Sequence, residues 1–143
     1  MHPVPKQISD IGIVPVIAID DAEKAVPLAK ALVAGGLPVA EVTFRTAAGE
    51  AAIRAISREV PEMLVGAGTV LTHDQLDRAL DAGARFIVSP GFNPDMVRYG
   101  LSKGALMVPG TATPGEMEQV VIRHSDLDQY PDLARITVHI EAE

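Results

Sequence analysis

The chain contains no cysteine or tryptophan, and aromatic residues make up only 3% of its 143 residues. Without cysteine, neither disulfide bonds nor thiolate metal sites can contribute, and a reducing compartment is compatible with the composition. No apolar run approaches the ~20 residues of a membrane span, and residues 1–10 lack the apolar core of a signal peptide. We therefore expect a soluble, cytoplasmic protein that does not use a membrane as a partner.

The chain also lacks a basic stripe, and its formal net charge is −7. This charge would repel phosphates, so the sequence argues against nucleic acid as a partner and favours a small-molecule ligand. Hydrophobic residues make up 48% of the chain, which is enough for one domain with a buried core. They are mostly alanine, valine, leucine and isoleucine, a composition that suits helices packed on a buried parallel sheet.

A short β-branched run, a turn and a helical stretch follow one another five times along the chain. The predicted strands are 13–17, 40–44, 64–67, 86–89 and 106–108. The predicted helices are 22–34, 48–59, 73–82, 94–102 and 114–124. Asp20, Thr72, Asn93 and Thr113 stand where N-caps belong, and glycines follow several of the predicted helices. This alternation predicts an α/β fold with parallel βα repeats.

The end of the chain has a different pattern. Residues 134–140 alternate apolar and polar side chains with period two, which predicts a sixth strand with one wet face. This strand would lie at a sheet edge or pair with another subunit. We divide the chain into a βα-repeat part, 1–119, and a divergent tail, 120–143, that belongs to the same domain.

Three side chains that can bind or react with a ligand lie near the carboxyl ends of two consecutive predicted strands. Glu41 and Arg45 lie around the end of the second strand, and Thr69 lies after the third. In a βα-repeat protein the carboxyl ends of the strands form one rim. A carboxylate, a guanidinium and a hydroxyl can therefore converge there on one small anionic substrate.

The motifs around these residues resemble the family of 2-keto-3-deoxy-6-phosphogluconate (KDPG) and 4-hydroxy-2-oxoglutarate (KHG) aldolases. The resemblance spans residues 13–118 and is carried by Val-Pro-Val-Ile at 14–17, Glu-Val-Thr-Phe-Arg-Thr at 41–46, Val-Gly-Ala-Gly-Thr-Val-Leu at 65–71, Ser-Pro-Gly at 89–91 and Val-Pro-Gly at 108–110. It implies five units of a (βα)8 (TIM) barrel followed by a divergent C-terminal strand. It also implies a 2-keto acid substrate such as pyruvate, and we expect no cofactor. His124 and His139 could bind a metal with Asp126 or Asp128, but their spacing matches no standard site, so we expect no metal.

The resemblance assigns catalytic proton transfer to Glu41, whose apolar neighbours would raise its pKa. It assigns the grip on the substrate carboxylate to Arg45. From the residues alone, an ordinary ion pair between Glu41 and Arg45, four positions apart, is at least as good an explanation of the carboxylate. The arginine alone would also suit a solvated loop.

Further substrate-binding positions follow from the same resemblance. Thr69 would supply a hydroxyl to the keto acid, and Gly66 and Gly68 would let the backbone approach the ligand closely. Pro90 and Pro109 would shape the pocket wall at the ends of the fourth and fifth strands. Without the family match, the glycine motif predicts only a turn at a strand end, and the prolines a structural role.

One part of the family pattern has no counterpart in this sequence. The family uses a lysine on its sixth strand to form a Schiff base, whereas the lysines here are Lys6, Lys24, Lys30 and Lys103, none at a predicted strand end. We therefore expect a class I keto-acid aldolase-like protein without full activity, and leave open whether it is an enzyme. The alternative is a non-catalytic truncated, chimeric or engineered fragment that serves folding or assembly.

Five βα units cannot close a barrel, and a barrel sequence carries its helices on one face of the sheet only. The other face is expected to be bare. Its cover would come from a rearrangement, a second copy of the chain or another partner. We expect a homo-oligomer, a trimer or a dimer.

Overall fold

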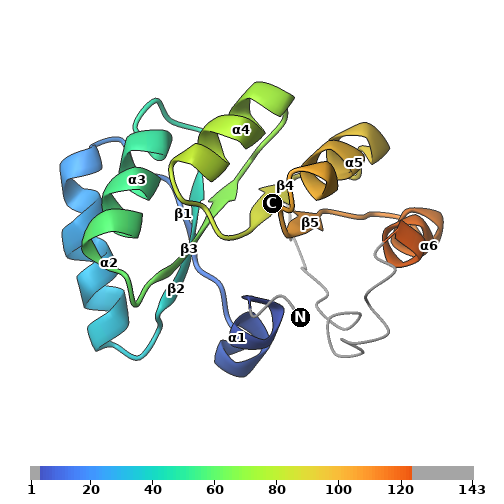
Figure 1. Cartoon of the computed structure of the whole chain (residues 1–143). Coiled ribbons are helices and arrows are strands. Elements are labelled where there is room, and N and C mark those ends of the chain that lie inside the picture. The colour runs from blue at the N-terminus through green and yellow to red at the C-terminus, as the bar shows by residue number, and fades with distance from the viewer. Residues whose placement is uncertain (1–3, 124–143) are drawn as a thin grey trace.

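The computed structural model describes residues 4–123, and Figure 1 shows its strands and helices alternating along the chain. The strands are β1 (Val16–Ile17), β2 (Val39–Thr43), β3 (Leu64–Gly68), β4 (Ile87–Ser89) and β5 (Met107–Pro109). All neighbouring pairs are parallel, and the order across the sheet is β1-β2-β3-β4-β5. The predicted α/β fold with parallel repeats is confirmed, and the carboxyl ends of the five strands lie along one rim.

The helices after the strands lie close to their predicted positions. They are α2 (Ala25–Ala34), α3 (Gly49–Glu59), α4 (His73–Asp81), α5 (Pro94–Ser102) and α6 (Pro114–Arg123). Thr72, Asn93 and Thr113 accept hydrogen bonds from backbone amides in the first turns, as N-caps do. The predicted end of the last helix at His124, and the predicted strand 134–140, lie outside the described residues.

One predicted cap is wrong by one residue. A 3-10 turn, η1 (Ala22–Lys24), precedes α2, and the Asp21 carboxylate caps it by accepting from the Glu23 amide at 3.0 Å. Asp20 was the expected cap. Two consecutive aspartates offer the same chemistry, so the sequence could not distinguish which carboxylate faces the amide.

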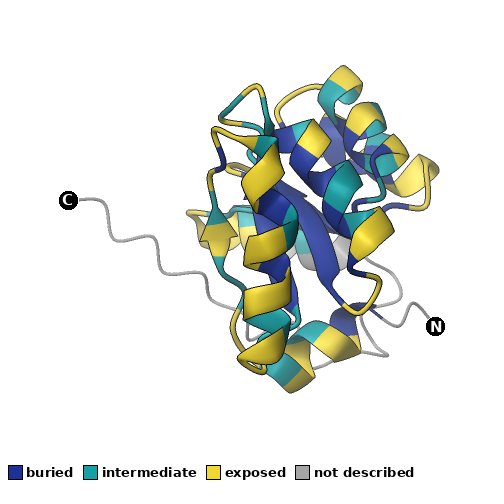
Figure 2. Cartoon of the chain, turned by 90° about the vertical axis from the view of Figure 1, so that its left-hand side faces the viewer, coloured by how far each residue is buried: buried dark blue, intermediate teal, exposed yellow. Residues whose placement is uncertain are grey.

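The outer face of the sheet packs against the helices. Ala40 and Val42 of β2 are buried there together with Ile53 and Ile56 of α3. Side chains alternate between the two faces of a strand, so Val39, Glu41 and Thr43 occupy the opposite, inner face. Figure 2 shows the strands as a dark blue, buried layer behind helices whose outward surfaces are yellow and exposed.

The inner face is not bare, contrary to expectation, because a helix missed by the sequence reasoning covers part of it. This helix, α1 (Val4–Ile11), places Val4, Ile8 and Ile11 against the cluster of Val39, Leu64 and Phe86. Figure 1 shows α1 on the other side of the strands from α2, α3 and α4. The spacing of four and three residues between these apolar positions suits a helix, and the prolines at 3 and 5 are compatible with its first turn.

The first strand is shorter than expected, with two residues instead of 13–17. Val16 pairs with Glu41 and Ile17 with Val42, and the Pro15 carbonyl accepts from the Glu41 amide at 2.9 Å. Pro15 has no amide to donate, so it cannot extend the ladder on that side. Ile13 is left 68% exposed. Within residues 4–123, β1 and β5 are the two edge strands of the sheet.

Candidate active site

Glu41 is the third residue of β2 and is only 8% exposed, on the inner face of the sheet. Its carboxylate lies over the backbone of Gly68, on the neighbouring strand β3. Burial raises the pKa of Glu41, and the positive charge of Arg45 offsets this rise only in part. A carboxyl group in this position can hold a proton at a higher pH than an exposed glutamate can.

Arg45 and Thr69 meet just beyond the carboxyl ends of β2 and β3. Arg45 Nε donates to Thr69 Oγ1 at 3.3 Å. The Thr69 backbone has φ = +57°, a left-handed conformation that is uncommon for residues other than glycine. The Phe44 amide donates to the Gly68 carbonyl at 2.8 Å, which extends the pairing of the two strands to this point. The structure thus brings Glu41, Arg45 and Thr69 together at one end of two adjacent strands.

From the residues alone, Glu41 and Arg45 could form an ordinary ion pair, or Arg45 could be a solvated loop residue, and the geometry bears on both explanations. The ion pairs formed within residues 4–123 do not include one between Glu41 and Arg45, so the arginine acts on the carboxylate through its charge. The Arg45 side chain is exposed, as a solvated loop arginine would be, but its Nε is held by Thr69.

Two threonines that the sequence reasoning passed over anchor the loop carrying Arg45. Thr43 Oγ1 donates to the Ile17 carbonyl at 3.2 Å, and Thr46 Oγ1 donates to the Ile19 carbonyl. The two hydroxyls tie the end of β2 to the last residue of β1 and to the segment that follows it. The available signal was their place on either side of Phe44 and Arg45 in the motif at 41–46, since hydroxyl side chains often bond to nearby backbone where a strand ends.

Pro90 and Pro109 lie farther along the rim, at the ends of β4 and β5. Pro109 pairs in register with Ser89, and the Gly110 amide donates to the Ser89 carbonyl at 2.8 Å. The Ser89 hydroxyl, which is buried, donates to the Gly91 carbonyl at 3.0 Å. These bonds give the rim a defined wall two and three strands away from Glu41.

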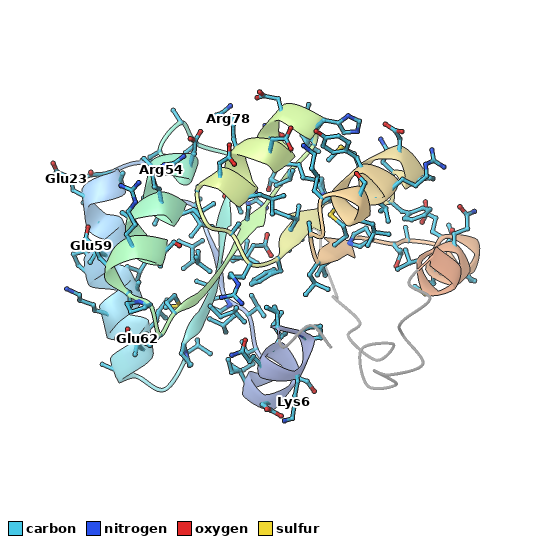
Figure 3. All side chains as sticks on the ribbon, in the orientation of Figure 1. Lys6, Glu23, Arg54, Glu59, Glu62 and Arg78 are labelled. Atoms are coloured by element: carbon cyan, nitrogen blue, oxygen red, sulfur yellow. The ribbon has the colours of Figure 1, made fainter. Side chains whose placement is uncertain are left out.

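The lysines lie away from this rim. Lys6 is on α1, paired with Asp10 at 2.6 Å, and Figure 3 shows it pointing outward from that helix. Lys24 is exposed in η1 and Lys30 in α2. Lys103 follows α5 and pairs with Asp77 at 3.0 Å. Within residues 4–123, none of the lysines forms an ion pair or a hydrogen bond with Glu41, Arg45 or Thr69.

Two surface depressions lie on the outer helices, and Glu41 lines neither of them. One follows α3 along Glu50, Arg54 and Arg58, and the other lies between α2 and α3 beside Glu23 and Glu59. Figure 3 shows Arg54 and Glu59 in this outer layer. Among residues 4–123, no three histidine, aspartate or glutamate side chains are grouped as a metal site would require. No helix in the same range is long and apolar enough to cross a membrane.

Comparison with known proteins identifies the family of this chain. Residues 4–131 match the family model described as KDPG and KHG aldolase. The chain belongs to the KDPG/KHG aldolase family. The match reaches beyond the motifs at 13–118 in both directions, so α1 also falls inside the aldolase family pattern.

Relatives in this aldolase family are longer than the chain, which matches only part of each of them. The 2-dehydro-3-deoxy-phosphogluconate aldolase of Treponema pallidum is 47% identical over 111 residues, which are 78% of this chain and 53% of that protein. The KHG/KDPG aldolase of Escherichia coli K12 is 49% identical over 105 residues, 73% of this chain and 49% of that protein. The chain therefore spans about half the length of these relatives.

Solved aldolase structures show the same partial coverage. The KDPG aldolase of Zymomonas mobilis ZM4, solved with 3-phosphoglycerate, superimposes with a TM-score of 0.77 at 39% identity, over 85% of this chain and 58% of that one. The KDPG aldolase of Legionella pneumophila, with pyruvate captured as a covalent carbinolamine intermediate, gives a TM-score of 0.74 at 39% identity, over 78% of this chain and 54% of that one. The five strands described here are thus part of an aldolase barrel.

Proposed function

We propose that this chain binds a small 2-keto acid, such as pyruvate, at the rim where Glu41, Arg45 and Thr69 meet. The observation that carries the proposal is the contact between Arg45 Nε and Thr69 Oγ1. This contact orients the guanidinium and leaves its two terminal amino groups, on an exposed side chain, for the carboxylate of a ligand. A bound pyruvate in the Legionella pneumophila relative supports this ligand class.

Glu41 is the proposed proton carrier of the site. Its burial favours the neutral carboxylic acid, which can donate a proton, while the nearby Arg45 keeps the carboxylate accessible as a base. A group that can both donate and accept a proton is what keto-acid chemistry needs at the carbonyl oxygen and at the carbon next to the carbonyl. Gly68, Thr69, Pro90 and Pro109 are the proposed surroundings of the ligand.

Cleavage of a carbon–carbon bond by the family's class I chemistry also needs an amine nucleophile. None of the four lysines of this sequence forms an ion pair or a hydrogen bond with Glu41, Arg45 or Thr69, and the chain spans about half the length of its relatives. We therefore propose that the chain by itself binds keto acids but lacks full aldolase activity. The cysteine-free sequence supports the cytoplasm as its place of action.

Binding of pyruvate tests this proposal when it is measured with two arginine variants. Arg45→Ala should weaken binding at least tenfold, because the carboxylate loses its bidentate partner. Arg58→Ala is the matched control, since Arg58 is an exposed arginine on the outer side in α3, and it should bind like the original chain. Equal affinities for all three proteins would reject the site. Acetate, which lacks the keto group, should bind more weakly than pyruvate.

A second candidate, assembly without catalysis, is supported by an apolar surface beside the site. Val16 pairs in register with Glu41 and is 57% exposed on the inner face, and Val88 and Leu106 of that face are only half-buried. A second copy of the chain would cover these side chains in a homo-oligomer, a dimer or a trimer.

Light scattering tests assembly directly. Val16→Asp should lower the mass measured for the native chain to that of a monomer. Leu28→Asp, on the outer helix α2, should leave the mass unchanged, although Leu28 is an exposed apolar residue like Val16. A native chain that is already monomeric at high concentration would remove the assembly candidate without affecting the binding site.

A further inference from the structure

The side chain of Glu41 occupies the space that a side chain at position 68 would need. A β-carbon built on Gly68 would lie 1.8 Å from Glu41 Oε1, 2.6 Å from Cδ and 2.7 Å from Cγ. These distances are far below van der Waals contact, and they involve most of the glutamate side chain. Glu41 therefore lies flat along the inner face of β3 and covers the α-carbon of Gly68.

The space in front of the other glycine of β3, Gly66, is filled by a different side chain. A β-carbon on Gly66 would lie 2.3 Å from two ring atoms of Phe86, so this glycine makes room for an aromatic ring of the inner core. Gly66 and Gly68 are two residues apart and face the same side of the sheet. The two glycines of the Gly-Ala-Gly motif thus make room for two different side chains, Phe86 and Glu41. Neither glycine has a positive φ, so the backbone conformation does not require glycine at either position.

The backbone of Gly68 is held where it is. Its carbonyl accepts from the Phe44 amide at 2.8 Å, and the residue pairs with Thr43 in the parallel register of β2 and β3. The next residue, Thr69, adopts the left-handed conformation that brings its hydroxyl to Arg45. A side chain added at position 68 therefore cannot be accommodated by moving the strand alone, and Glu41 must move.

We infer that Gly68 is a positioning residue for Glu41: its missing side chain forms the seat that keeps the carboxylate buried beside Arg45. This inference rests on the proposed function only for its catalytic meaning, since the seat itself is a property of the packing. It differs from the expectation that Gly68 admits the ligand to the backbone. With alanine at position 68, the carboxylate leaves its seat for a more solvated place.

Two measurements on the intact chain test the seat. The first is the titration of the Glu41 carboxyl carbon by NMR, in the original chain, in Gly68→Ala and in Gly91→Ala. Gly91 is the control because a β-carbon there meets nothing within 4 Å. Burial raises the pKa of Glu41 in the original chain. The midpoint should move down toward that of an exposed glutamate in Gly68→Ala and should stay in place in Gly91→Ala.

The second measurement is a double-mutant cycle of stability in urea. Gly68→Ala should lower the unfolding midpoint of the original chain, and it should lower it much less when Glu41 is already alanine. Gly66→Ala is the matched control, because its clash is with Phe86 and should be the same in both backgrounds. If Gly68→Ala alone does not fold, the inference requires that Glu41→Ala/Gly68→Ala does.

The outcomes separate this inference from the proposed function. A folded Gly68→Ala chain with an unchanged Glu41 midpoint would overturn the seat, as would an equal loss of stability in both backgrounds. A Glu41 that titrates like an exposed glutamate in the original chain would instead count against its role as proton carrier. The urea cycle would still decide whether Gly68 seats the side chain.

Discussion

Phe86 offers the sharpest test of how the inner face is built. Its side chain is 2% exposed, lies against Gly66 and belongs to the cluster with Val4, Val39 and Leu64. Replacing a buried phenylalanine by alanine typically costs about 3–5 kcal/mol, because transfer free energy is lost and a cavity remains. A domain has a free energy of unfolding of about 5–15 kcal/mol in total. Phe86→Ala should therefore remove about a fifth or more of the stability.

Urea unfolding followed by circular dichroism measures this loss. Ile13→Ala is the control, since Ile13 is 68% exposed and its truncation should change the free energy of unfolding by less than about 0.5 kcal/mol. A loss below about 1 kcal/mol for Phe86→Ala would refute the reasoning. It would mean that α1 and the inner face of the sheet do not form a packed cluster.

Three other predictions follow from the site and the tail. Because burial raises the pKa of Glu41 above its ordinary value of 4.5, the folded chain holds this proton after the unfolded chain has released it. Stability should therefore fall as the pH rises through the window just above 4.5, and Glu41→Gln should flatten this slope in urea unfolding at several pH values. The chain alone should cleave KDPG negligibly, and borohydride with pyruvate should add no mass to it; turnover within about a hundredfold of an intact relative would show that another group replaces the amine. In the tail, Val138→Asp should lower the melting temperature or dissociate an oligomer whereas Thr137→Asp should do little, and equal small effects would mean that 134–140 does not dock as a strand.

The repeats of the fold could be predicted from the sequence because local signals agreed with one another. Apolar β-branched runs, the cap residues Thr72, Asn93 and Thr113, and the left-handed glycines Gly36, Gly83 and Gly104 all marked boundaries that the structure confirms. The parallel order of the strands followed from their alternation with helices. Element ends still differed by one to three residues, as at the start of β1 and at the cap Asp21.

Other features could not be predicted because they depend on contacts between distant segments. The helix α1 is stabilised by the burial of Val4 against Val39 of β2, Leu64 of β3 and Phe86 just before β4, which its short sequence with two early prolines does not indicate. The rim residues were located by a family resemblance, whereas the periodicity of the strands showed only that they lie at strand ends. That Gly68 accommodates Glu41 depends on the register of β2 against β3, which a sequence does not state.

The most direct test of the central claim is a residue-resolved NMR titration of the chain with pyruvate. Backbone amide signals of Phe44, Arg45, Gly68 and Thr69 should shift together with a single affinity, because the ligand carboxylate would join the guanidinium that Thr69 holds. The same titration of Arg45→Ala should move none of them. Shifts confined to the depression between α2 and α3, or the same shifts in Arg45→Ala, would contradict a keto-acid site at this rim.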